Sequence, residues 1–180
     1  MVKIINTGLP KEFNEKIITE LAGSHLWRIA TDENRGAIDI SKKGKGDTGF
    51  SFTTYRENEM NSVGSFWNSL AEIIFYIVTS KLKMPNARIV RTMYNFYTPS
   101  ARCNMHIDTQ SEKGFSILYN FHDNDGGTFF ENENKIYPSK ESQALVFKSN
   151  IKHKGIAPKE YVGRLNLNMI CMNDKDIQKL

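Results

Sequence analysis

Cysteine is scarce in this chain of 180 residues, which contains only Cys103 and Cys171. Two cysteines so far apart form neither a Cys-x-x-Cys motif nor the set of disulfides that holds small secreted domains together. The first residues also lack an apolar segment of signal-peptide length. We therefore expect a protein that works in a reducing, cytoplasmic environment.

Long hydrophobic runs are missing as well. The most apolar stretch, residues 70–78, is interrupted by Glu72 and is far shorter than the roughly 20 residues that cross a bilayer. No contact with a membrane is expected. Proline and glycine, with 5 and 12 residues, show no excess that would indicate disorder, and 39% of the residues are hydrophobic. We expect a single domain over residues 1–180.

Clustered positive charge is limited to one short run, although the net charge is +4 and the pI is about 9.0. That run is Lys42-Lys43-Gly44-Lys45, which we interpret as a solvated loop. A nucleic-acid-binding surface normally gathers basic residues on one face or stripe. Nucleic acid is therefore not an expected partner.

Helical and hairpin patterns occupy the first half of the chain. Apolar residues recur at helical spacing over residues 10–21, and a continuous apolar stripe over residues 61–82 predicts a longer helix. Residues 36–41 and 49–55 alternate in the manner of a β-hairpin. We expect residues 1–86 to form a support of helices and a hairpin. We also expect residues 41–62 to form a mobile lid over the substrate, because they are rich in Gly, Lys, Asn and Glu.

Short β-like runs, each bounded by turn residues, follow after residue 86. This spacing predicts a mainly β fold of the α+β class, a sandwich or barrel with the two helices packed outside one sheet. The catalytic core is expected over residues 87–175. The expected strands cover residues 88–97, 115–121, 128–133, 143–148 and 164–172.

The motif His106-Ile107-Asp108 carries the first chemical signal. On a strand, alternate side chains point the same way, so His106 and Asp108 are expected to share one face. His153 lies three predicted strands further on, where a returning strand could bring it opposite. Two histidines and one carboxylate form the facial triad of non-haem iron(II) oxygenases, which leaves coordination positions open.

A basic residue near this group strengthens the interpretation. Arg164 follows His153 by eleven residues and begins an alternating strand, so that Arg164, Asn166 and Asn168 are expected to share one face. The planar guanidinium binds a carboxylate through two hydrogen bonds, which suits one end of 2-oxoglutarate. Lys152 and Lys154 are the next candidates for the same anion.

Six motifs then follow one another along residues 88–172. They are RTMYNFY at 91–97, His106-x-Asp108, LYNF at 118–121, DGGTF at 125–129, ALVF at 144–147, and His153 followed by GR at 163–164. In this order the chain resembles the 2-oxoglutarate/Fe(II)-dependent oxygenase superfamily, and within it the prolyl 4-hydroxylase-like branch. The resemblance implies a double-stranded β-helix, or jelly roll, with N-terminal helices packed on one sheet.

The resemblance also implies roles for individual residues. It makes His106, Asp108 and His153 the Fe(II) ligands and catalytic centre. Arg164 and Tyr119 would bind the carboxylate of 2-oxoglutarate, and Tyr97 would lie beside 2-oxoglutarate and iron, with Tyr94 as an alternative to Tyr97. A large aromatic residue that the branch often carries six residues after the arginine is replaced by Ile170.

The implied activity is that of a dioxygenase that uses O2 and 2-oxoglutarate to hydroxylate a C–H bond, with release of succinate and CO2. The favoured substrate is a prolyl residue of a peptide or protein, and ascorbate is an optional reductant. Three alternatives stay open: a small-molecule substrate, a nucleic-acid base, or a non-catalytic jelly-roll module that binds metal. Arg164 is the residue that distinguishes the module from the enzymes. A structural metal site is also usually closed by a fourth protein ligand, and the sequence offers no convincing fourth.

Overall fold

The structure is a computed structural model that describes residues 1–30, 49–57 and 65–173. Within these ranges it contains ten strands, two α-helices and a 3-10 turn, η1. The helices are α1 (Lys11–Ala22) and α2 (Ser65–Lys81), and η1 covers Glu131–Glu133. The strands are β1 (Lys3–Asn6), β2 (Arg28–Ala30), β3 (Gly49–Arg56), β4 (Ala87–Tyr97), β5 (Gly114–Asn120), β6 (Asn124–Phe130), β7 (Lys135–Ser139), β8 (Gln143–Lys148), β9 (His153–Ile156) and β10 (Arg164–Asn173).

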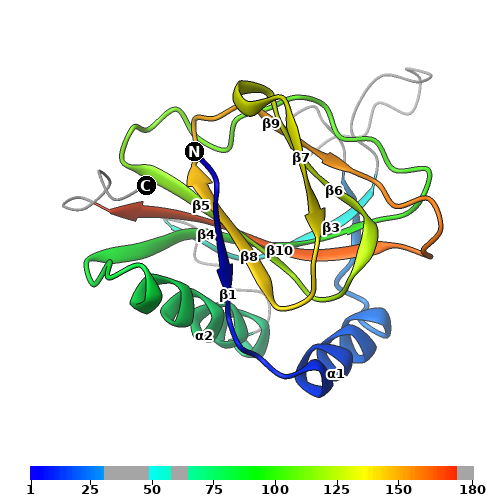
Figure 1. Cartoon of the computed structure of the whole chain (residues 1–180). Helices are drawn as coiled ribbons and strands as arrows, with labels where there is room; N and C mark the ends of the chain where they lie inside the picture. The colour runs from blue at the N-terminus through cyan, green and yellow to red at the C-terminus, as the bar shows by residue number, and fades with distance from the viewer. Residues whose placement is uncertain (31–48, 58–64, 174–180) are drawn as a thin grey trace.

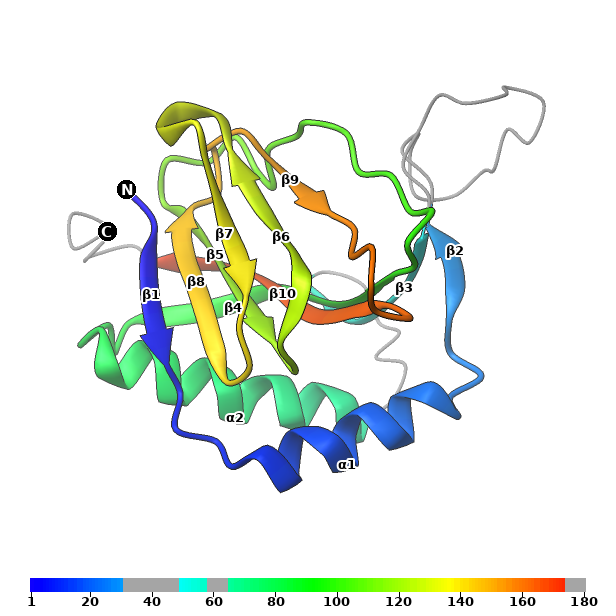
Figure 2. The same cartoon turned by 45° about the vertical axis from the view of Figure 1, so that its right-hand side comes forward.

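The strands form two antiparallel sheets. The major sheet has seven strands in the order β1-β8-β5-β10-β4-β3-β2, and the minor sheet has the order β7-β6-β9. The minor sheet lies across from the major sheet, while both helices cover the outer side of the major sheet (Figures 1 and 2). The expected jelly roll with helices on one sheet is therefore confirmed.

The helices begin and end where local chemistry requires it. The carbonyl oxygen of Pro10 accepts hydrogen bonds from Phe13 and Asn14, and this begins α1. After α2, Lys83 takes a left-handed conformation with φ of 56°, the Met84 amide donates to the Thr79 carbonyl, and Pro85 follows. A left-handed residue with this bond ends a helix by satisfying one of its last carbonyl groups.

The two faces of the major sheet have different partners. On β5, Phe115, Ile117 and Tyr119 belong to the large core between the sheet and the helices. Leu118 belongs instead to a smaller cluster with residues of β6, β7 and β8, in the space between the two sheets. Alternate residues of one strand thus serve two layers, as the period of two requires.

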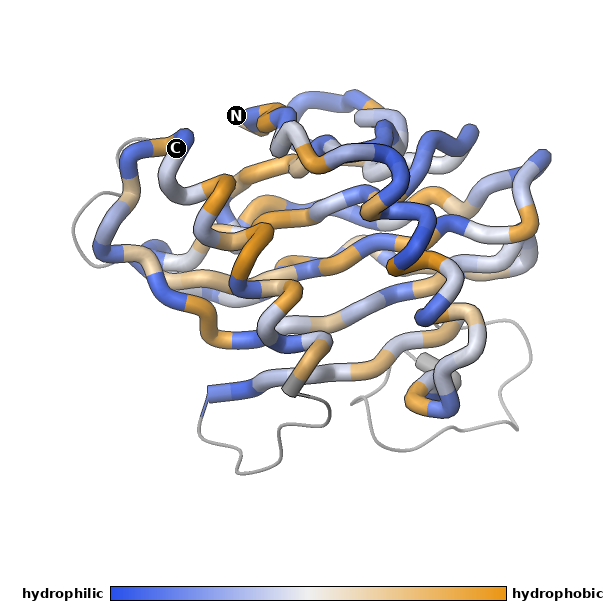
Figure 3. Tube along the Cα trace, turned by 90° about the horizontal axis from the view of Figure 1, so that it is seen from below, coloured by the Kyte–Doolittle hydropathy of each residue, from blue (hydrophilic) through white to orange (hydrophobic). Residues whose placement is uncertain are grey.

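The large core gathers the inner faces of both helices. Figure 3 looks at the helical side of the molecule, and hydrophobic segments recur along α2. Ile74 and Val78 are fully buried there, and Ile17 of α1 is nearly so. No helix in the described part of the chain is long and apolar enough to cross a bilayer.

The observed strands agree with the sequence prediction at β3, β4, β5, β8 and β10, and the prediction misses β1, β7 and β9. Strand β6 begins at Asn124 and ends at Phe130, earlier than the predicted residues 128–133. Strands β1 and β3 pair with β8 and β4, so residues before position 86 complete the same sheet as the expected core. The first strand of the expected hairpin, residues 36–41, and the Lys42 to Lys45 run lie outside the described residues.

The expected lid needs a correction. Residues 49–56 form β3, which pairs with β4 through a register shift near Thr54. Phe52 is buried in the core and stacks on Tyr94, with ring centroids 5.0 Å apart. A strand fixed by such pairing and burial cannot act as a mobile cover. The remainder of the expected lid, residues 41–48 and 58–62, lies outside the described residues.

Candidate metal centre

The structure brings His106, Asp108 and His153 together, with ligand atoms that all lie within 4.8 Å of one another. His106 and Asp108 belong to the segment between β4 and β5, and His153 begins β9. His106 and His153 form an isolated antiparallel bridge, whose two backbone hydrogen bonds measure 3.0 and 2.9 Å. The side chains therefore converge as expected, although His106 lies in a single bridge and not in a longer strand.

Both imidazole rings are oriented by the backbone. His106 Nδ1 lies 2.9 Å from the carbonyl oxygen of Asn104, and His153 Nδ1 lies 2.9 Å from that of Ile151. A carbonyl oxygen only accepts, so each Nδ1 carries the hydrogen. The Nε2 atoms face Asp108 at 3.9 and 3.8 Å. This is the arrangement of metal-binding histidines, whose second nitrogen is fixed by a hydrogen bond.

Asp108 is held from several sides. Its side chain is 1% exposed. Ser116 donates to Oδ2 at 2.5 Å, Asn168 donates to Oδ1 at 3.3 Å, and Arg91 Nη2 lies 3.7 Å from Oδ1. Its backbone amide donates to the carbonyl oxygen of Ser149 at 2.9 Å. A buried polar group needs such partners, and these contacts also fix the orientation of the carboxylate oxygens that could bind a metal.

The two histidines differ in their surroundings. Burial lowers the pKa of His106, but hydrogen bonds with the Cys103 thiol and the Asn104 carbonyl, together with the charge of Asp108, outweigh it and raise the pKa to about 9. Burial lowers the pKa of His153, and Asp108 only partly opposes this. His106 is also the more open side chain, at 33% exposure against 5% for His153. The group is therefore accessible from the His106 side.

Arg164 lies at the far end of the same sheet face. It is 1% exposed, and its guanidinium donates to the Gly127 carbonyl oxygen and, at 2.9 Å, to Thr128 Oγ1. It also lies 5.7 Å from the centroid of the Tyr97 ring. Burial lowers its pKa. Its Nε atom is buried without a hydrogen-bond partner, and no carboxylate pairs with it in the described part of the chain. A buried cation in this state favours an anionic ligand.

A polar row connects the two ends. Asn166 of β10 lies between Arg164 and Asn168, the residue that donates to Asp108, and Asn95 of β4 donates to Asn166 Oδ1 at 3.1 Å. At about 3.3 Å per strand residue, Arg164 and Asn168 are about 13 Å apart along β10. Polar side chains therefore line the sheet between the metal-ligand group and the buried guanidinium of Arg164.

The three tyrosines named from the sequence have different positions. Tyr97 is the cross-strand partner of Arg164, and a side chain added at Gly155 of β9 would meet its ring, so Tyr97 lies on the site side. Tyr119 lies in the helical layer, where its hydroxyl donates to Asn14 Oδ1 at 2.6 Å. Tyr94 also lies in that layer and donates to the Trp67 carbonyl oxygen. Only Tyr97 is brought to Arg164.

The sequence alone could not place Tyr119 in the helical layer, and the reason is physical. Strand β5 is buried on both faces, so its composition does not reveal which residues face the helices. Burial raises the pKa of Tyr119, and its hydrogen-bond neighbours Ser142, Thr7 and Asn14 only partly oppose this. The residues of β5 that face the other layer are its alternate members, Ser116 and Leu118.

Sequence reasoning missed Arg91 and Ser116, which both contact Asp108. Arg91 shares the period of two with Asn95 and Tyr97 on β4, and this was the one signal that could have placed it on the site face. Ser116 carried no such signal, because only the packing of the segment after β4 brings Asp108 onto it.

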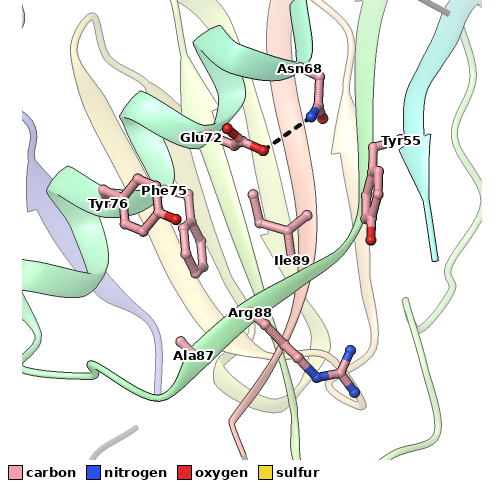
Figure 4. A pocket seen from close by; sticks show the side chains of 8 residues that line it. All are labelled: Tyr55, Asn68, Glu72, Phe75, Tyr76, Ala87, Arg88 and Ile89. Carbon is pink, nitrogen blue, oxygen red and sulfur yellow. Dashed lines mark hydrogen bonds between the residues drawn. The ribbon is translucent and has the colours of Figure 1, made fainter. Parts of the chain in front are cut away.

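A separate cavity of about 220 Å³ lies on the helical side of the major sheet. Figure 4 shows Asn68 and Glu72 of α2 on one side and Ala87 and Ile89 of β4 on the other. Asn68 donates to Glu72 at 3.2 Å. This cavity contains none of the metal-ligand residues, and the sheet separates it from them.

Comparison with known proteins gives a result at the level of structure. No protein-family model matches the sequence, and no curated protein matches it. Similar solved structures include an oxidoreductase of the 2OG-Fe(II) oxygenase family from Burkholderia pseudomallei, with 11% identity, 95% of this chain and 84% of that chain covered, and a TM-score of 0.67.

Two further structures contain 2-oxoglutarate. The viral collagen prolyl hydroxylase vCPH from Paramecium Bursaria Chlorella virus-1, in complex with 2OG, has 13% identity, covers 95% of this chain and 96% of that one, and has a TM-score of 0.60. HygX from Streptomyces hygroscopicus, with nickel and 2-oxoglutarate bound, has 9% identity, 97% and 83% coverage, and a TM-score of 0.62. At these identities the likeness establishes a shared fold.

Proposed function

We propose that this protein is a 2-oxoglutarate- and Fe(II)-dependent dioxygenase that hydroxylates a C–H bond. The observation that carries the proposal is one sheet face that holds both a three-ligand metal group and a buried arginine with an unsatisfied Nε. The solved structures of similar fold support it, since two of them contain 2-oxoglutarate.

The residues fit the metal. His106 and His153 would bind it through Nε2, because each Nδ1 is engaged by a backbone carbonyl. Asp108 supplies the carboxylate. Two imidazoles and one carboxylate suit Fe(II) and leave positions open for 2-oxoglutarate and O2. A structural zinc site normally has four protein ligands, and the group found among the described residues has three.

The residues also fit 2-oxoglutarate. Arg164 would bind its distal carboxylate, while Gly127 and Thr128 hold the guanidinium and Tyr97 lies over it. When bound, Fe(II) and 2-oxoglutarate supply the oxidising power for C–H hydroxylation, and 2-oxoglutarate leaves as succinate and CO2. The protein contributes the ligands, the anion site and the buried, hydrogen-bonded surroundings of Asp108.

For the primary substrate we propose a prolyl residue of a peptide or protein, by analogy with the viral collagen prolyl hydroxylase of similar fold. The oxygenase proposal does not depend on the prolyl one, and the two are tested separately.

The test of the oxygenase proposal is anaerobic addition of Fe(II) and 2-oxoglutarate to the purified protein. We expect the weak visible absorption band of an Fe(II)–oxoglutarate chelate in the wild-type protein. Arg164→Met and His153→Ala should each weaken it, whereas His25→Ala, which changes an exposed histidine, should not. A protein that binds zinc tightly and gives no band with Fe(II) and 2-oxoglutarate is a non-catalytic metal-binding module.

The prolyl proposal is tested with a library of proline-containing peptides under air. Hydroxylated product in step with succinate supports it. Succinate formation with no modified peptide removes the prolyl substrate and leaves the oxygenase in place.

A further inference from the structure

A second buried arginine, Arg91, lies at the opposite end of the site face from Arg164. Its cross-strand partner on β10 is Ile170, six residues beyond Arg164, or about 20 Å along the strand. Ile170 pairs in turn with Ser116, which donates to Asp108. Arg91 therefore lies beside Asp108, whereas Arg164 lies at the far end of the polar row.

Arg91 is poorly satisfied for a buried charge. Its side chain is 6% exposed, and neither Nε nor Nη2 makes a hydrogen bond. Asp108, at 3.7 Å, is its only carboxylate partner in the described part of the chain. Arg164 has the same features, a buried guanidinium and an unpartnered Nε. Two buried guanidinium groups, each with an unpartnered Nε, at the two ends of one site suggest two anion positions.

The charges of a site loaded with Fe(II) and 2-oxoglutarate would not cancel. The inference rests on the proposed function. Bound Fe(II) would be balanced by Asp108 and by one carboxylate of 2-oxoglutarate, and Arg164 would be balanced by the other carboxylate. The histidines are neutral when they bind metal. Counted together, Fe(II), Arg164 and Arg91 carry one positive charge more than Asp108 and 2-oxoglutarate balance. Arg91 has to share Asp108 with the metal, which is costly for a buried cation.

We infer that the primary substrate carries a carboxylate that Arg91 binds. The loaded site has an excess of one positive charge, which favours a carboxylate over a phosphate. A carboxylate brings one negative charge, whereas a phosphate monoester brings nearly two. The guanidinium fork matches the two carboxylate oxygens, and Nε and Nη2 are adjacent donors of that fork. A substrate anchored there approaches the metal from the side opposite Arg164.

The test measures binding to the protein loaded with Fe(II) and 2-oxoglutarate without O2, so that nothing turns over. The probes are matched pairs with and without the charge. One set consists of N-acetyl-L-amino acids, including N-acetyl-L-proline, and their primary amides. The other consists of amidated prolyl tetrapeptides with aspartate next to proline, and their asparagine counterparts. The first set represents free acids and the second represents acidic peptides.

We expect at least one carboxylate probe to bind the wild-type protein about tenfold more tightly than its uncharged counterpart by calorimetry, as a charged hydrogen bond implies. Arg91→Gln should reduce that preference to less than about threefold. Arg91→Lys should retain part of it, because the charge stays and the fork is lost. Arg88→Gln is the matched control, since it removes an exposed charge from the same strand and should leave the preference unchanged.

Equal binding of every matched pair by the wild-type protein overturns the inference, and so does a preference that survives in Arg91→Gln. If Arg91→Gln does not fold, Arg91→Lys decides: it must weaken the preference while the Fe(II)–oxoglutarate band stays. A wild-type protein without that band contradicts the proposed function itself, whereas a normal band with no carboxylate preference contradicts only the role of Arg91.

Discussion

His106 and His153 are held opposite each other by two reciprocal backbone hydrogen bonds, 3.0 and 2.9 Å long, between segments distant in sequence. Their ring centroids are 4.5 Å apart. The backbone therefore fixes both metal-facing nitrogens before any metal binds, and the cost of assembling the site is met during folding.

Removal of any one metal ligand should abolish iron-dependent turnover of 2-oxoglutarate. His106→Ala, Asp108→Ala and His153→Ala each delete one of three ligands, so we expect succinate release to fall to background. His122→Ala serves as the control, because His122 Nε2 accepts a hydrogen bond from the Leu165 backbone amide and His122 is not part of the metal-ligand group. Full activity in any of the three ligand variants contradicts the assignment.

Arg164→Lys should raise the 2-oxoglutarate requirement without a comparable change for iron. Lysine keeps the charge but loses the planar fork that reaches both Gly127 and Thr128. We expect the apparent KM for 2-oxoglutarate to rise roughly tenfold or more, the effect of one lost charged hydrogen bond. An unchanged titration would move the anion site elsewhere, with Lys152 or Lys154 as the next positions to change.

Ser116→Ala should weaken metal binding although Ser116 is not a ligand. Its hydroxyl donates to Asp108 Oδ2 at 2.5 Å, and loss of such an orienting bond typically costs about 10- to 100-fold in metal affinity. Titration of the metal-free protein with Mn(II) measures this directly. Ser149→Ala removes only the hydroxyl that lies 2.8 Å from Ser116, so it should have a smaller effect. Equal affinities in wild type and Ser116→Ala would assign Ser116 to packing alone.

Tyr119→Phe should reduce stability and leave 2-oxoglutarate binding unchanged. The lost hydroxyl leaves Asn14, which is fully buried, without the 2.6 Å bond to its Oδ1. We expect unfolding to require about 1–3 kcal/mol less free energy, as measured by urea denaturation. A raised 2-oxoglutarate requirement in a stable Tyr119→Phe protein would instead support the role that the family resemblance implies.

The Glu133 carboxylate should contribute stability that depends on pH. The hydrogen bond from the Tyr137 hydroxyl, 2.6 Å long, is the main cause of a lowered pKa, which burial partly opposes and the Val2 amide supports. Because the folded pKa is the lower one, the contribution is present above the unfolded pKa of about 4.3 and is lost as pH falls through the folded value.

Glu133→Gln should therefore be less stable than wild type at pH 7 by about 1 kcal/mol, the worth of a typical hydrogen bond. The difference should shrink as unfolding is repeated at pH values below about 4. Glu131→Gln, at an exposed neighbouring position, is the control. A difference that is constant from pH 7 to pH 3 would show that the charge of Glu133 contributes nothing.

Local patterns were sufficient for much of the architecture. Helix α2 and strands β4, β8 and β10 follow from apolar periodicity and from the turn residues between them, because each has a buried face that repeats at its own period. Strands β7 and β9 escaped prediction. They are short, and their alternation is weak, so only pairing with β6 makes them strands.

The sequence by itself determined that His106 and Asp108 lie two residues apart, that His153 and Arg164 follow in order, and that Arg164 shares a strand face with Asn166 and Asn168. Residue types and a period of two are local properties, so they can be read along the chain. The chemical identity of the site rests on them.

Only the tertiary structure decided which partners these residues meet. The placement of Ser116 and Arg91 against Asp108, and of Tyr119 against Asn14 on the other side of the sheet, depends on contacts between distant segments. Strand β5 is buried on both faces, so its composition is compatible with either orientation. The pairing of β5 with β10 fixes the choice, because a shift of one residue would exchange Ser116 and Tyr119 between the two layers.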